Sequence, residues 1–234
     1  MTSTPAIVIR EQLTPAHQVF IAEMGARHVG DIKELVELVH PSMGLITSVG
    51  PQHLDTFGTI ERVRDTKYEL IDGLPKDGTA IFARDGAICE ELYARCPLEH
   101  KYMPGMLVNA KEIASGPWGT RFTLVDTRTG EQASCQTRLL GEHSISNLLL
   151  CCTAARALGM TLEEIALGVS HCQPVEHRLE LLDGGAYYMS NIELLIGQSS
   201  TEGERKRDAR QKNRALLPSR TNGGHLSDVR PPEI

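Results

Sequence analysis

The first ninety residues alternate between short apolar runs and longer amphipathic stretches. The short runs have the pattern of buried strands and occupy residues 18–22, 44–49 and 79–83. Between them, apolar positions recur at helical spacing in a segment capped by Asp31 and again at residues 59–74. Strands that alternate with helices at this spacing form βαβ units with a parallel sheet. The predicted fold class is therefore α/β, a mostly parallel sheet with flanking helices.

After residue 100 the pattern becomes that of a small antiparallel sheet followed by helices. Two short alternating runs, 120–126 and 133–139, flank a polar turn at 127–130, which predicts a β-hairpin. The strongly apolar segment 145–158 predicts a helix. A second helix is expected to begin at Thr161, because a Glu three positions later completes a capping box.

Three regions of unequal length are expected along the chain. Residues 1–182 form one domain, whose last strand is predicted at 178–188, residues 183–198 begin another domain, and residues 199–234 form a disordered tail. The tail has no aromatic and few aliphatic side chains, so it cannot bury enough apolar surface to offset the entropy of ordering. Its eight Lys or Arg residues against five Asp or Glu favour a solvated tail over a nucleic-acid-binding segment.

The composition is that of an ordinary globular protein. Hydrophobic residues make up 41% and charged residues 23%, and the net charge of −6 does not favour nucleic acid or a membrane surface as a partner. The longest apolar run, near residues 148–152, is far shorter than the roughly 18–20 residues of a membrane span. Residues 1–13 lack the pattern of a secretory signal. We therefore expect a cytoplasmic protein.

Cysteine usage agrees with a reducing compartment. No C-x-x-C pair occurs, and the cysteines lie inside apolar segments. This favours buried, reduced thiols, while a disulfide framework or a metal cluster stays an alternative. The six residues are Cys89, Cys96, Cys135, Cys151, Cys152 and Cys172.

Three polar residues lie where a parallel sheet would present a ligand site. Glu23 ends the first predicted strand, His53 follows the second, and Lys67 lies in the helix after that. Ligands of such sheets bind at the carboxyl ends of the strands. Carboxylate and imidazole groups suit Mg²⁺ when a phosphate supplies further ligands. Taken singly, each of the three also fits a solvated surface residue.

The context of these residues is more specific. Within residues 19–74 the chain reads E-M-G-A, then G-D-I before a helix, then G-P-Q-H-L-D-T-F-G, then K-Y-E in a second helix. A second block reads G-E-H-S-I-S-N at 141–147 and P-V-E-H-R at 174–178. In this order and spacing, residues 1–188 resemble the central domain of the Mur ligases. These are ATP- and Mg²⁺-dependent enzymes of peptidoglycan biosynthesis.

The resemblance implies a role for each matched position near the metal. Glu23 and His53 match the residues that hold Mg²⁺ in the family. Lys67 matches a lysine that CO₂ carbamylates, which converts a cation into a catalytic anion beside the metal. Because only the neutral amine reacts with CO₂, partial burial would favour the reaction by lowering the pKa of the lysine.

The second block implies the nucleotide side of the same site. Asn147 matches an asparagine that contacts the nucleotide, His143 belongs to the same motif, and Arg178 matches an arginine that reaches the phosphates. The wording H-V-G-D-I-K-E-L and T-S-V-G-P-Q-H-L is most similar to the members that add D-Ala-D-Ala to UDP-MurNAc-tripeptide. In the implied reaction ATP phosphorylates the tripeptide carboxylate, and the dipeptide amine then attacks the acyl-phosphate. Metal ions and the arginine would neutralise charge in both steps.

The chain departs from the family pattern at several points. It contains no Gly-Lys dipeptide and therefore no P-loop of the form G-x-x-x-x-G-K-[ST]. Ser144 replaces the first asparagine of the family's H-N-x-x-N, on the adenine side. The two flanking domains of the family lie outside the resemblance. We expect a partial ligase, from a truncated or frameshifted reading frame, that is inactive by itself.

Two alternatives stay open at this point. The chain could be a non-catalytic binding module on the same scaffold, completed by a separately encoded P-loop piece. It could also derive from a related ligase with another substrate, such as another Mur ligase, folylpolyglutamate synthase or cyanophycin synthetase.

Overall fold

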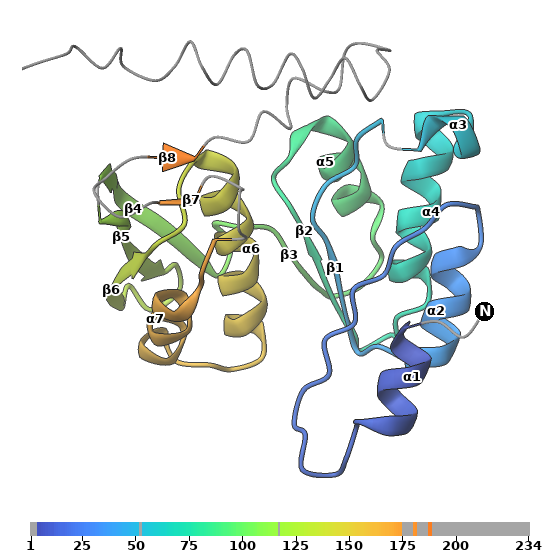
Figure 1. The fold of residues 1–234 in the computed structure, drawn as a ribbon, viewed down its shortest axis with the longest axis horizontal. Coiled ribbons are helices and arrows are strands. Elements are labelled where there is room, and N and C mark those ends of the chain that lie inside the picture. Colours follow the sequence, from blue (N-terminus) through green and yellow to red (C-terminus); the bar gives the residue numbers. More distant parts are fainter. Residues whose placement is uncertain (1–3, 52, 117, 175–179, 182–186, 189–234) are drawn as a thin grey trace, which may run out of the picture. The chain divides into compact units, whose positions relative to one another are not determined.

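The computed structural model describes residues 4–51, 53–116, 118–174, 180–181 and 187–188 (Figure 1). These residues belong to one compact unit, Met1–Tyr188. The predicted disordered tail at 199–234 lies outside the described residues, as does the segment 183–198 apart from Tyr187 and Tyr188. The division of the chain into three regions therefore stays a prediction.

A three-stranded parallel sheet forms the first part of the unit. Its strands are β1 (Met43–Ile46), β2 (Thr79–Phe82) and β3 (His100–Tyr102), in the order β1-β2-β3. The strands predicted at 44–49 and 79–83 are thus confirmed, each with a slightly different end. The predicted α/β class with a mostly parallel sheet is confirmed as well.

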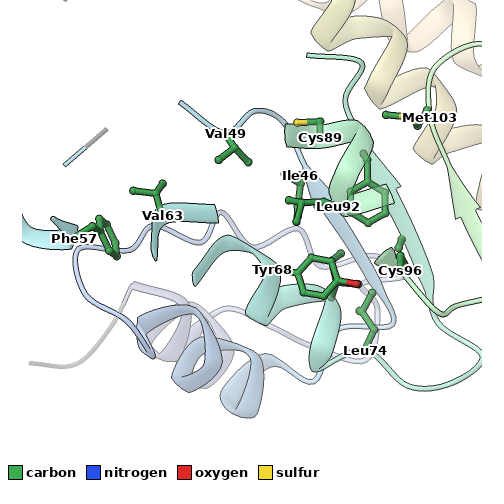
Figure 2. Close-up of a cluster of buried hydrophobic side chains, with 13 residues drawn as sticks. Ile46, Val49, Phe57, Val63, Tyr68, Leu74, Cys89, Leu92, Cys96 and Met103 are labelled. Atoms are coloured by element: carbon green, nitrogen blue, oxygen red, sulfur yellow. The ribbon is translucent and has the colours of Figure 1, made fainter. Parts of the chain in front are cut away.

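Helices α4 (Ile60–Asp72) and α5 (Gly86–Arg95) cover one face of this sheet. Figure 2 shows the side chains of Ile46, Tyr68 and Leu92 in this apolar layer, which we call the α4–α5 layer. The predicted helix at 59–74 is confirmed, because its hydroxyl-bearing N-cap, Thr59, accepts a hydrogen bond from the Arg62 backbone N–H at 3.3 Å.

Helix α6 (Glu142–Ala157) packs on the opposite face, where Leu150 joins Ile81 and Ala83. Other residues of α6, Leu148 and Cys152, pack into the cluster formed by the second sheet. A helix that is apolar on more than one side is buried between layers. The helix begins at Glu142 and not at the predicted residue 145, because the apolar pattern used for the prediction starts only at Ile145.

The second sheet is antiparallel and consists of β4 (Val108–Gly116), β5 (Gly119–Asp126) and β6 (Gln132–Thr137) in that order. The predicted hairpin at 120–139 is therefore confirmed. Helix α7 (Leu162–His171) packs in the same apolar cluster as β5 and β6. It begins with the predicted capping box, in which the Thr161 and Glu164 side chains each accept a hydrogen bond from the other residue's backbone N–H.

The predicted single strand at 178–188 is wrong in its described part. Two short strands, β7 (Glu180–Leu181) and β8 (Tyr187–Tyr188), pair antiparallel with each other. The chain must reverse its direction between them, so one continuous strand is excluded.

The predicted first strand at 18–22 is wrong as well. These residues have no strand partner, and the side chains of Val19 and Ile21 are 59% and 88% exposed. A β-strand forms only where another strand satisfies its N–H and C=O groups, and β1 is hydrogen-bonded only to β2 among the described residues. The apolar pattern alone could not supply that partner.

Helices α1 (Thr4–Glu11) and α2 (Asp31–Val39) flank this segment. The predicted helix beginning near Asp31 is confirmed, but its N-cap is Gly30, with φ 94°. Asp31 is instead the first helical residue. Its carboxylate accepts hydrogen bonds from the backbone of the preceding loop. No helix among the described residues is long and apolar enough to cross a membrane.

Four of the six cysteines are buried, as expected, and all six are free thiols. Cys151 is exposed and Cys172 is partly exposed, which the apolar context of both did not indicate. Burial raises the pKa of Cys135 to about 11 and the pKa of Cys152 to about 12, so both thiols are protonated near neutral pH.

Candidate functional site

The candidate site lies at the carboxyl end of the parallel sheet. There β1 leads into the segment 47–53 and the short helix α3 (Leu54–Phe57), and β2 leads into residues 83–85 and α5. Helix α6 begins at this same end of the sheet (Figure 1). Parallel strands present ligands at this edge because their carboxyl ends meet there.

Lys67 reaches this end of the sheet from α4. Its Nζ donates a hydrogen bond to the Ser48 backbone carbonyl at 2.7 Å, just beyond the end of β1. Burial lowers the pKa of Lys67, and the nearby Cys89 thiol opposes this shift to a smaller extent. A lysine with a lowered pKa is more often a neutral amine, which is the form that acts as a nucleophile.

His53 lies five residues after Ser48 in the chain. It is the N-cap of α3 and adopts a left-handed conformation, with φ 53° and ψ 36°. Its carbonyl accepts hydrogen bonds from the backbone N–H groups of Thr56 and Phe57, at 3.0 and 2.9 Å, while the residue as a whole is exposed. A non-glycine residue held in this conformation is uncommon, and such positions concentrate at functional sites. The imidazole is therefore accessible to a ligand.

Glu23 lies in the irregular segment that joins α1 to α2, and it is exposed. Three residues later, Ala26 packs against the α4–α5 layer. The loop then closes at Asp31, whose Oδ2 accepts hydrogen bonds from the backbone N–H groups of Arg27 and His28 at 2.8 Å each. Glu69 of α4 also binds this loop, through the Gly30 N–H at 2.9 Å. The loop that carries Glu23 is thus held in place by Asp31 of α2, by Glu69 of α4 and by the packing of Ala26.

His143 and Asn147 occupy the first two turns of α6 and are both exposed. Residues four apart on a helix share a face, so the two side chains lie on the same side of α6. Ser144, between them, is partly buried. Arg178, the remaining candidate, lies outside the described residues.

The structure brings some of these residues together and leaves others apart. Lys67 lies against the strand end that leads to His53, but within the described residues no hydrogen bond or ion pair joins Glu23, His53 or Lys67 to another of the three. No group of three His, Cys, Asp or Glu residues in the described part of the chain could hold a metal ion. One carboxylate and one imidazole fit Mg²⁺ only if phosphate, water or a modified Lys67 completes its shell.

Several contacts at this site could not be found from the sequence. The Ser48 carbonyl is a backbone group, and the residues that it and Glu69 contact are 19 and 39 positions away. Glu69 belongs to the K-Y-E motif and Asp31 to the G-D-I motif, so their place in those motifs was the only available signal.

Comparison with known proteins identifies the family. The Mur ligase middle domain matches residues 6–155. The UDP-N-acetylmuramoyl-tripeptide–D-alanyl-D-alanine ligase of Haemophilus influenzae is 31% identical over 170 residues, which cover 72% of this chain and 36% of that enzyme. The corresponding ligase of Escherichia coli is 30% identical over 173 residues, which cover 72% of this chain and 38% of that enzyme.

Solved structures agree with this match. A crystal structure of MurF from Acinetobacter baumannii has a TM-score of 0.66 and 28% identity, covering 75% of this chain and 38% of that chain. MurF from Thermotoga maritima, solved in complex with ADP, shares the fold with a TM-score of 0.55 at 21% identity, over 68% of this chain and 36% of that chain. The chain spans 36% and 38% of the lengths of the two curated ligases described above. Since the family match takes in more than half of its residues, the chain belongs to the Mur ligase middle-domain family.

Proposed function

We propose that this domain supplies the lysine-bearing and metal-binding side of the active site of an ATP-dependent ligase that joins D-Ala-D-Ala to UDP-MurNAc-tripeptide. The observation that carries the proposal is the position of Lys67. Its amine is partly buried at the carboxyl end of β1, 2.7 Å from the Ser48 carbonyl, and its pKa is lowered. The substrates follow from the names of the relatives, which are UDP-N-acetylmuramoyl-tripeptide–D-alanyl-D-alanine ligases.

Lys67 would act after reaction with CO₂. The neutral amine attacks the carbon of CO₂, a C–N bond forms, and one proton leaves, so that the side chain becomes an anionic carbamate. Carbamylation removes the positive charge of Nζ. The nitrogen keeps one N–H, which can still donate a hydrogen bond to the Ser48 carbonyl. That carbonyl would therefore hold the modified side chain in its present direction.

Glu23, His53 and the Lys67 carbamate would then form the metal side of the site. When bound there, Mg²⁺ supplies positive charge that offsets the charge of the transferring phosphoryl group. The exposed imidazole of His53 and the exposed carboxylate of Glu23 both remain open to a ligand that arrives with its own phosphate oxygens. We assign His143, Asn147 and Arg178 to the nucleotide.

In the proposed reaction the γ-phosphoryl group of ATP passes to the terminal carboxylate of the tripeptide. The amine of D-Ala-D-Ala then attacks the resulting acyl-phosphate, an amide bond forms, and phosphate and a proton leave. The 234-residue chain has no Gly-Lys dipeptide and so no P-loop to hold the phosphates of ATP. We therefore assign it part of the site and not the complete reaction.

The proposal is tested by looking for the carbamate directly. The purified chain is placed in ¹³C-bicarbonate near pH 8, and its ¹³C spectrum is recorded. We expect a carbamate signal that disappears in Lys67→Arg, since the guanidinium is not deprotonated and cannot attack CO₂. Lys76→Arg, at an exposed lysine on the turn after α4, is the matched control and should keep the signal. A spectrum that Lys67→Arg leaves unchanged would reject the proposal.

A second candidate function is a binding module completed by another chain. It is favoured by the exposed apolar side chains of Val19 and Ile21 and by the position of β1 at an edge of its sheet among the described residues. An unpaired strand edge is a template for a strand of another polypeptide. A copurifying P-loop polypeptide that binds ATP with this chain, but does not form the amide with the substrates added, would favour this candidate.

A further inference from the structure

The first turn of α2 is capped by a residue from another helix. Gly30, its N-cap, has no side chain that could accept hydrogen bonds from the free N–H groups of the helix. The Glu69 carboxylate of α4 fills this role with both oxygens. Its Oε1 accepts from the Gly30 N–H and its Oε2 accepts from the Lys33 N–H, each at 2.9 Å. The negative charge also lies at the positive end of the helix dipole.

A second contact joins the same two helices one turn further along α4. Gly73, directly after α4, lies so close to Val36 of α2 that a Cβ atom at this position would collide with the valine side chain. Helix α2 is therefore held to α4 at two separate points. The loop that precedes α2 is folded back by Asp31, and Ala26 of that loop packs against the α4–α5 layer.

These contacts connect the two sides of the proposed metal site. Glu69 lies two residues after Lys67 on α4, and Gly30 lies seven residues after Glu23. We propose that Glu69 is a positioning residue, whose carboxylate fixes the loop that bears Glu23 relative to the helix that bears Lys67. The catalytic importance of this positioning rests on the proposed function. The attachment of the loop and α2 to α4, which we call the clamp, rests on the hydrogen bonds of Glu69.

A simple structural cap would stabilise α2 without directing Glu23. The two roles predict different behaviour of the loop at residues 23–28 when the Glu69 hydrogen bonds are removed and α2 stays folded. If Glu69 positions the loop, its removal separates Glu23 from Lys67 while the helices persist. If Glu69 only caps, the loop stays in place through Ala26 and Asp31.

The test uses the ¹⁵N-labelled full chain and its Glu69→Gln variant, which keeps the size of the side chain but can accept through only one oxygen. Glu37→Gln is the matched control, because Glu37 is an exposed carboxylate of α2 that accepts no hydrogen bond from the described residues. We expect the Gly30 and Lys33 amides to exchange about tenfold faster in Glu69→Gln. We also expect the loop at 23–28 to lose order, and Glu37→Gln to behave as the unmodified chain.

A paramagnetic probe then reports on the site. Mn²⁺, added with bicarbonate as a substitute for Mg²⁺, should broaden the amide signals of Glu23 and Lys67 together in the unmodified chain. In Glu69→Gln we expect the Glu23 signal to lose this broadening. Joint broadening of both signals at the same Mn²⁺ concentration in the variant would overturn the proposal, and so would an unchanged loop.

Failure of the proposed function is recognised separately. If Mn²⁺ broadens neither signal in the unmodified chain, the metal assignment falls, and the Overhauser contacts of the Ala26 methyl group with the α4–α5 layer decide the positioning role. Loss of these contacts in Glu69→Gln supports it, and their retention overturns it. Should Glu69→Gln not fold, Glu69→Asp replaces it, since one methylene fewer prevents the carboxylate from reaching both amides.

Discussion

The two sheets of the unit differ in how far apart in the sequence their paired strands lie. The antiparallel sheet is built from strands adjacent in the chain, since β5 pairs with both β4 and β6. The parallel sheet has β1 at its edge, and the apolar segment before it remains exposed at Val19 and Ile21 among the described residues. All three residues proposed for the metal side lie in the half of the unit that contains the parallel sheet. The antiparallel sheet therefore forms from neighbouring strands, whereas the parallel sheet requires the pairing of strands that are separated by helices.

Activity gives the largest expected difference between the two halves. The purified 234-residue chain should show no ATP-dependent addition of D-Ala-D-Ala, since its sequence contains no P-loop to hold the phosphates. The measurement is phosphate release and product formation, with the Escherichia coli ligase as the positive control. Turnover above that of a heat-treated sample would show that the chain holds the phosphates of ATP without a P-loop.

Asp126 should be the most sensitive residue of the antiparallel half. Its side chain is fully buried and accepts hydrogen bonds from Arg156 Nε at 2.7 Å and from the backbone N–H groups of Arg128 and Thr129 at 2.8 and 3.0 Å. Asp126→Ala leaves two amides unpaired and removes the ionic partner of the partly buried Arg156 guanidinium, which keeps its hydrogen bond to the Met160 carbonyl. It should lower the free energy of unfolding by about 3 kcal/mol. Urea denaturation measures this, with Asp55→Ala, at an exposed carboxylate, as the control. A loss below about 1 kcal/mol would contradict the role given to Asp126.

The same residue predicts a pH dependence. Burial by itself would raise the pKa of Asp126, but the hydrogen bonds from Thr129, Arg156 and Arg128 outweigh it and hold the pKa at about 2. Because the unfolded chain has the ordinary value near 3.8, stability from this carboxylate is complete above that pH and is lost as pH falls towards 2. Asp126→Asn should therefore lack about 2 kcal/mol of this acid-dependent stability, as urea denaturation between pH 5 and 2.5 would show. Equal slopes in both proteins would exclude the assignment.

A smaller effect is expected at the start of α7. Thr161→Ala removes the side-chain half of the capping box and should cost about 1 kcal/mol, whereas Thr161→Ser should cost little because the hydroxyl remains. Thermal unfolding of the two variants measures the difference. If both variants lose the same stability, the methyl group and not the cap is responsible.

The smallest effect on stability, and the clearest distinction between the halves, is expected at Ile21. Since its side chain is 88% exposed, Ile21→Lys should change the free energy of unfolding by no more than about 0.5 kcal/mol. Self-association of the chain should decrease, because an exposed apolar side chain is replaced by a charged one. Sedimentation at several concentrations measures this. A large loss of stability would mean that residues 18–22 are packed after all.

Local patterns predicted much of the fold. The helix near Asp31, the helix after Thr59, the hairpin and the capping box at Thr161 all depend on residues that are close in sequence. The segment at 18–22 shows the limit of this reasoning, because an apolar run becomes a strand only when another strand lies beside it. The same limit applies to the start of α2, where the Gly30 N–H donates to a carboxylate that comes from α4.

The sequence by itself determined the family, the α/β class and the identity of the candidate residues Glu23, His53 and Lys67. Motif order and the periods of 2 and 3.6 residues are properties of short segments, so they can be read without a structure. Only the tertiary structure decided that Lys67 lies against the Ser48 carbonyl and that Glu69 clamps the loop before α2. These contacts join residues 19 and 39 positions apart. The local period of hydrophobic positions contains no information about which distant segments fold against each other.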